Sequence, residues 1–113
     1  MKILKIFAAI AILCIAFNTA HAQTITETIK VSGNCGTCEK HIEKAAKDAG
    51  ADKANWNKKT KFLTVTYDRK KTTNDAIQKK IAAVGYDTEK YTGDIKAYKD
   101  LDECCQYEGK RKN

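Results

Sequence analysis

The amino-acid sequence predicts an α+β fold, a ferredoxin-like βαββαβ sandwich followed by a short C-terminal extension. Alternating apolar and polar residues predict four strands, at residues 24–31, 51–57, 62–68 and 86–91. Two stretches with apolar residues at helical spacing lie between strands, and a glycine follows each of them. This order of elements fits within about 70 residues, as the split βαβ arrangement requires.

The first strand and the first helix follow directly from the residue pattern. In residues 24–31 isoleucine and valine share one face, with threonine and lysine on the other. From Cys38 onward the apolar residues recur at helical spacing, with glutamate and lysine on the outside. Gly50 is a natural stop for this helix.

The second half of the domain carries similar signals. Residues 57–60, Asn-Lys-Lys-Thr, predict the turn of a hairpin, and Trp56 just before them is expected in the core. Residues 72–75 offer several N-cap candidates for the second helix, which Gly85 ends. The extension from Gly93 onward has apolar residues at helical spacing.

The first 22 residues predict a cleaved secretory signal peptide. Lys2 and Lys5 give a positive start, twelve apolar residues follow at 6–17, and residues 20–22 are Ala-His-Ala. Twelve apolar residues are fewer than the roughly 20 that span a bilayer. We therefore expect a periplasmic or secreted protein without stable membrane insertion.

The mature chain is expected to contain one small domain at residues 23–92 and an extension at 93–113 that ends in a basic tail. Removing the two signal lysines from 21 basic residues leaves 19 against 14 acidic ones, a net charge of +5. The lysines are spread along the chain, and export argues against a nucleic-acid partner. The charge is therefore interpreted as promoting solubility.

Cys35 and Cys38 are the candidate metal ligands. They lie where the first strand gives way to the first helix, and the positive end of a helix favours thiolate over thiol. Two thiolates separated by two residues can reach one ion, and thiolates select soft metals. A two-sulfur site suits Cu(I) or Hg(II), whereas structural zinc normally has four protein ligands. Cu(I) is the favoured ion, with Hg(II), Ag(I) and Zn(II) as alternatives.

Residues 31–45, Val-Ser-Gly-Asn-Cys-Gly-Thr-Cys-Glu-Lys-His-Ile-Glu-Lys-Ala, resemble the metal-binding segment of heavy-metal-associated (HMA) domains. This family includes bacterial copper chaperones, the periplasmic mercuric-ion binding protein and the N-terminal domains of copper-exporting P-type ATPases. Residues 64–68 and 84–87 resemble its third strand and the turn before its last strand. The resemblance extends over residues 24–91.

The resemblance implies that Cys35 and Cys38 hold the metal and that Tyr86 packs near the site. It implies transient docking to a metal transporter or to another metal-binding domain. A cysteine of that partner would attack the two-coordinate ion, and the ion would pass on by thiolate ligand exchange in metal transport or detoxification. The chain departs from the family at residues 33–34, Gly-Asn, where the usual methionine is missing and the loop is one residue shorter.

Other functions of the Cys35–Cys38 pair are a redox dithiol and a small disulfide. A periplasmic thiol–disulfide redox protein is the alternative of a different class, but thioredoxin-like proteins rely on a cis-proline and this chain has no proline. No acid–base constellation or nucleotide-binding loop is evident in the sequence, so we do not expect an enzyme.

Cys104 and Cys105 are candidate auxiliary ligands, together with Tyr86. The two cysteines could also bridge to the first pair, pair between molecules, or report metal occupancy in a sensing module. His41 lies one helical turn from Cys38, but its ring is expected to point outward.

Overall fold

The computed structural model describes residues 23–106, so the expected signal peptide and basic tail lie outside the described residues. The elements are β1 (Thr24–Lys30), α2 (Gly36–Asp48), β2 (Lys53–Trp56), β3 (Phe62–Asp68), α3 (Asn74–Ala83), α4 (Ile95–Lys99) and the 3-10 helix η1 (Glu103–Cys105). Among these helices, none has the length and apolar character that a membrane span requires.

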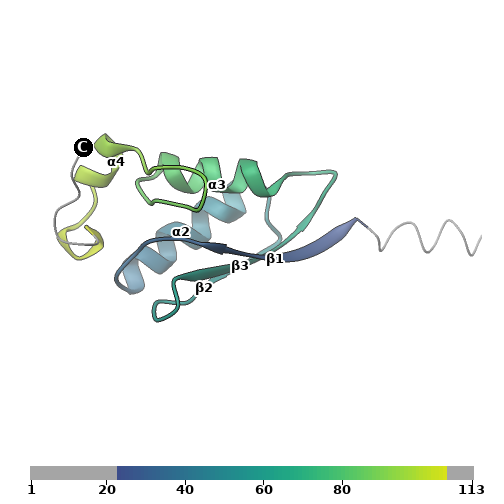
Figure 1. Cartoon of the computed structure of the whole chain (residues 1–113), viewed down its shortest axis with the longest axis horizontal. Coiled ribbons are helices and arrows are strands. Elements are labelled where there is room, and N and C mark those ends of the chain that lie inside the picture. The colour runs from purple at the N-terminus through teal and green to yellow at the C-terminus, as the bar shows by residue number, and fades with distance from the viewer. Residues whose placement is uncertain (1–22, 107–113) are drawn as a thin grey trace, which may run out of the picture.

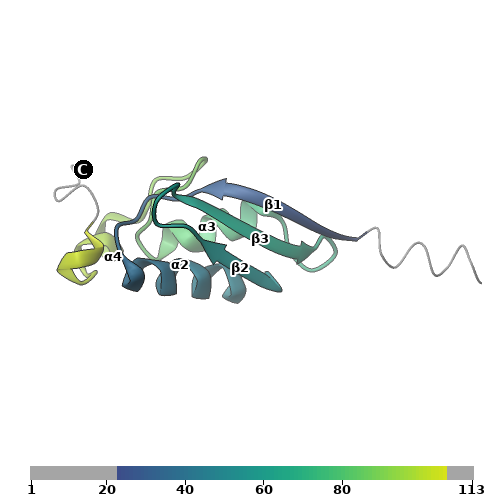
Figure 2. The ribbon, with the colours of Figure 1, turned by 90° about the horizontal axis from the view of Figure 1, so that it is seen from below.

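The strands form an antiparallel sheet with the order β1-β3-β2. Ile29 of β1 lies opposite Leu63 of β3, and Trp56 of β2 lies opposite the same leucine. Because side chains alternate along a strand, this register directs all three toward one face. Helices α2 and α3 cover that face (Figures 1 and 2). The two-layer α+β fold is thus confirmed.

The core lies between the sheet and the two helices. Trp56 is 2% exposed, as expected of a core residue. The stripe predicted for the first helix is also buried, since α2 turns Ile42, Ala45 and Ala46 inward. Burial of one large aliphatic side chain stabilises a fold by about 1.5–3 kcal/mol relative to exposure. The aliphatic side chains larger than alanine that are 0% exposed are Ile29, Val31, Ile42, Leu63, Val65, Ile77 and Ile81.

The predicted helix ends and hairpin turn are confirmed. Thr73 is the N-cap of α3, and its hydroxyl accepts a hydrogen bond from the backbone N–H of Ala76 at 3.0 Å. Gly50 follows α2 with φ of +113°, a conformation that favours glycine. In the turn between β2 and β3, the side chain of Asn57 accepts a hydrogen bond from the backbone N–H of Lys59 at 2.8 Å.

The prediction of a last strand at residues 86–91 is wrong. This segment makes only an isolated bridge, between Val31 and Thr88. Beside the bridge, the backbone N–H of Lys30 donates to the carboxylate of Glu89 at 2.7 Å. A side chain therefore takes the place of a backbone acceptor, and a regular ladder does not form.

The C-terminal extension packs against the domain. Its predicted helical segment corresponds to α4, where Tyr98 is 4% exposed. The backbone N–H of Asp94 donates to the carbonyl of Ala82 at 2.7 Å. Gly93 and Gly85 touch so closely that a Cβ on Gly93 would lie 2.7 Å from the carbonyl carbon of Gly85. The extension is therefore a packed part of the fold as far as residue 106, where the described residues end.

Candidate metal centre

Cys35 and Cys38 lie on the loop and first helical turn that connect β1 to α2. Cys35 is the N-cap residue of α2 and has an extended backbone, with φ of −145°. Its side chain is half-buried, whereas Cys38 is 0% exposed. The two Sγ atoms are 3.5 Å apart. The pair therefore presents one accessible and one enclosed sulfur.

The loop before Cys35 rests on an aromatic side chain. A Cβ added to Gly33 would lie 2.9 Å from the ring of Trp56, so only glycine allows this close approach. The indole N–H of Trp56 donates to the carbonyl of Val31 at 3.0 Å. Lys61 donates from Nζ to the carbonyl of Gly33 at 2.5 Å. The sequence pattern did not indicate that Trp56 and Lys61 support the loop.

The extension brings Cys104 and Cys105 to the first cysteine pair. The Sγ of Cys35 lies 3.4 Å from that of Cys104 and 3.8 Å from that of Cys105. The side-chain amide of Asn34 donates to the carbonyl of Cys104 at 3.1 Å, which ties the extension to the loop. Figure 2 shows the yellow segment that contains η1 beside the first turn of α2. All four cysteines within residues 23–106 have free thiols.

The environment of Cys35 favours its thiolate. Burial raises the pKa of Cys35, but the backbone N–H of Cys38 and the neighbouring thiols, that of Cys104 first among them, outweigh it and lower the pKa to about 6. This agrees with the expected effect of the helix start. Burial raises the pKa of Cys105, and the contact with Cys35 raises the pKa of Cys104. Negative charge therefore settles first on Cys35.

Tyr86 lies beside the cysteines, where the sequence resemblance had suggested. Its side chain is 0% exposed. Burial is the main cause that raises the pKa of Tyr86, and the neighbouring thiols of Cys105 and Cys38 raise it further. The phenol therefore stays protonated at neutral pH. Its hydroxyl lies 3.0 Å from Nδ1 of His41. The expectation that His41 points outward is wrong, since this contact holds the ring half-buried.

Three of the four sulfurs form a compact group. The Sγ atoms of Cys35, Cys38 and Cys105 all lie within 4.8 Å of one another. Thiolates in such a group bind soft ions such as Cu(I), Hg(II) or Zn(II) in preference to Mg²⁺ or Ca²⁺. The geometry is suited to holding one ion through two or three sulfurs.

The sequence model of the heavy-metal-associated domain matches residues 23–87. The chain belongs to this family. The match includes Cys35, Cys38 and Tyr86 and ends before Cys104 and Cys105. The second cysteine pair is therefore outside the part of the chain that defines an HMA domain.

Solved HMA-type structures resemble this chain. The CopZ metallochaperone is 29% identical with a TM-score of 0.54, and the match covers 57% of this chain and 98% of CopZ. The water-soluble region of the P-type ATPase CopA from Bacillus subtilis is 37% identical with a TM-score of 0.54. That match covers 58% of this chain and 45% of the CopA region. No curated protein matches the chain significantly.

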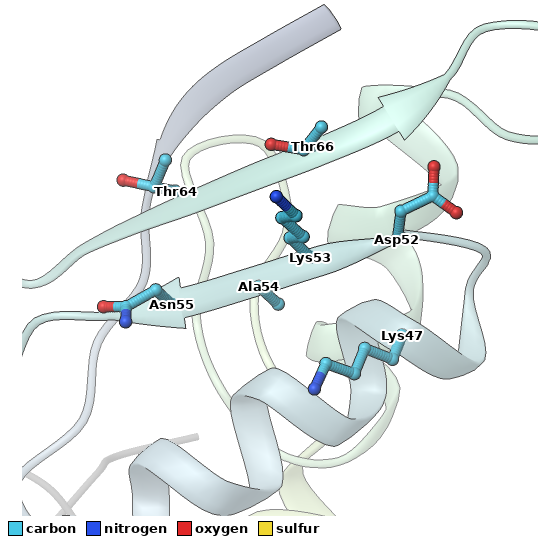
Figure 3. A pocket seen from close by; sticks show the side chains of 7 residues that line it. All are labelled: Lys47, Asp52, Lys53, Ala54, Asn55, Thr64 and Thr66. Atoms are coloured by element: carbon cyan, nitrogen blue, oxygen red, sulfur yellow. The ribbon is translucent and has the colours of Figure 1, made fainter. Parts of the chain in front are cut away.

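A hollow of this HMA domain lies at the outer side of the edge strand β2 (Figure 3). It has a volume of about 400 Å³ and combines side chains from α2, β2 and β3. None of its lining residues is a cysteine or a histidine, so it is separate from the thiol cluster. The lining consists of Lys47, Asp52, Lys53, Ala54, Asn55, Thr64 and Thr66.

Proposed function

We propose that this HMA domain binds a soft metal ion, with Cu(I) favoured, through Cys35 and Cys38 and passes it to a partner by thiolate ligand exchange. The observation that carries the proposal is the 3.5 Å separation of the two Sγ atoms at the start of α2. Two sulfurs this close can bind the same ion. Hg(II), Ag(I) and Zn(II) are the alternative ions.

The unequal exposure of the two ligands gives the exchange a direction. A partner's thiolate attacks the ion from the side of half-buried Cys35 and forms a new metal–sulfur bond. The bond to Cys35 then breaks, and that to buried Cys38 breaks once a second partner sulfur has bound. No electron is transferred. Because the pKa of Cys35 is about 6, its sulfur needs no proton at neutral pH when it leaves the ion.

The relatives indicate the class of partner. CopZ is a metallochaperone and CopA is a P-type ATPase. We therefore propose a metal transporter or another metal-binding domain as the partner, met in the periplasm or outside the cell after removal of the signal peptide. In this role the protein carries an ion and catalyses no reaction.

The test is a titration of the reduced protein with Cu(I) in the presence of a competing chelator. We expect one tight site, which Cys35→Ser or Cys38→Ser abolishes. Gly36→Ala is the matched control, because it alters the residue between the cysteines but adds a Cβ with nothing within 4 Å. Binding that survives both serine substitutions would refute the proposed ligands.

A thiol–disulfide redox protein is the second candidate. The observation that favours it is the low pKa of Cys35 beside three other thiols. A thiolate of this kind can attack a substrate disulfide. Under this alternative the reduced protein shows no tight Cu(I) site but exchanges disulfides with a test substrate, and Cys35→Ser stops the exchange.

A further inference from the structure

We propose that Cys105 is a third ligand to the ion held by Cys35 and Cys38, so that the C-terminal extension completes a three-thiolate site. This inference rests on the proposed function, because it concerns the same ion. It adds a ligand from beyond residues 23–87, the part matched by the family model.

The sulfur separations favour three-coordination over two-coordination. With metal–sulfur bonds of about 2.3 Å, two sulfurs lie about 4.6 Å apart across a linear ion and about 4.0 Å apart around a trigonal one. The Sγ of Cys35 is 3.5 Å from that of Cys38 and 3.8 Å from that of Cys105. Both separations are nearer to the trigonal value. Since the third separation is within 4.8 Å, the trigonal geometry needs only small adjustments.

The described part of the extension, residues 93–106, is held at two points, which keeps Cys105 in place. At its start, the backbone N–H of Asp94 donates a hydrogen bond to the carbonyl of Ala82, and Gly93 packs against Gly85. Next to Cys105 itself, the side-chain amide of Asn34 donates to the carbonyl of Cys104. The third sulfur is therefore held in position before an ion arrives, which reduces the conformational entropy that binding must remove.

A buried cysteine is often only a small apolar residue of a core. Cys105 is 0% exposed, but its sulfur lies beside the thiol of Cys35. The thiol of Cys38 also lies within 4.8 Å of this sulfur, and the hydroxyl of Tyr86 is its neighbour. Polar groups around a buried sulfur are unusual for core packing and suit a ligand. Cys104, the next residue, is exposed and provides a comparison.

The number of sulfur ligands provides the test. The reduced full-length protein is loaded with one equivalent of Cu(I) and studied by X-ray absorption. We expect three sulfur ligands in the unmodified protein and in Cys104→Ser, but two in Cys105→Ser. In a chelator competition, Cys105→Ser is expected to bind Cu(I) about tenfold or more weakly, a change of about 1.4 kcal/mol or more.

Cys105→Ala checks that the result does not come from misfolding, with circular dichroism and the fluorescence of Trp56 as measures of the fold. The inference would be overturned if the unmodified protein gave only two sulfur ligands. It would also be overturned if Cys104→Ser lost a sulfur ligand and Cys105→Ser kept all three. Either result would leave Cys35 and Cys38 as ligands. Failure of the proposed function is distinct, because the unmodified protein would then bind no Cu(I) tightly.

Discussion

The Nδ1 atom of His41 lies 3.0 Å from the hydroxyl oxygen of Tyr86, 45 residues further along the chain. The contact joins α2 to the segment after α3. The same hydroxyl lies next to the thiols of Cys38 and Cys105, so the contact also helps to hold one side of the thiol cluster in place. The contact therefore links the stability of the domain to the geometry of the cysteines.

Removing this hydrogen bond should destabilise the apo protein. Tyr86→Phe and His41→Phe are each expected to lower the free energy of unfolding by about 1 kcal/mol, the net contribution of a typical internal hydrogen bond. Because both variants remove the same contact, the double variant should lose less than the sum. Urea denaturation measures all four proteins. Strict additivity would contradict the contact.

The close approach of Gly33 to Trp56 should make this glycine essential for the loop. Gly33→Ala places a Cβ 2.9 Å from a rigid ring and 3.3 Å from the Cβ of Cys38. We expect the free energy of unfolding to fall by about 1–3 kcal/mol, as for other overpacked sites. The fluorescence of Trp56 should shift as well. The control is Gly36→Ala, which meets open space and should stabilise the start of α2 by up to about 1 kcal/mol.

The fold was predictable from sequence wherever the pattern was local. The alternation in β1 and β3, the Thr73 cap and the Gly50 stop each depend on residues near in sequence, and all are present in the structure. The last strand was predicted wrongly because two of the backbone hydrogen bonds around it go to side chains that are distant in sequence. The backbone N–H of Lys90 donates to the side chain of Gln78, a partner that no periodicity reveals.

The site also has a part that depends on local sequence and a part that depends on distant packing. Two residues between Cys35 and Cys38 are enough to bring their sulfurs together at a helix start. The position of Cys105 depends instead on how the extension packs, through contacts such as that between Gly85 and the backbone of Tyr98. The sequence contains these residues but gives no signal for their contact, so the role of the second cysteine pair was left open.

Gly85 should control the docking of the extension. Its φ is +107°, and an added Cβ would lie 2.8 Å from the backbone nitrogen of Tyr98. We expect Gly85→Ala to release the extension and to raise amide hydrogen exchange at residues 95–106 selectively. Gly50→Ala is the control, since Gly50 has a similar φ of +113° but faces Thr72. Gly50→Ala should destabilise the domain without a selective rise of amide hydrogen exchange in the extension. An equal rise of exchange at residues 95–106 in both variants would contradict the prediction.

Glu27 should make the stability of the apo protein depend on pH. The hydroxyl of Tyr67 and then the amide of Asn74 lower the pKa of Glu27 from its usual 4.5 by hydrogen bonding to the carboxylate. The stabilisation is therefore fully present above about pH 4.5 and is lost as the pH falls through the lower pKa of the folded state. Urea denaturation between about pH 5 and about pH 3 should show a steeper loss of stability in the unmodified protein than in Glu27→Gln. The difference should not exceed about 1 kcal/mol, because the carboxylate is partly exposed to solvent. Tyr67→Phe removes the largest cause of the lowered pKa of Glu27, so it should reduce the pH dependence of stability in the same way. Equal pH dependence in the unmodified protein, Glu27→Gln and Tyr67→Phe would exclude this role of Glu27.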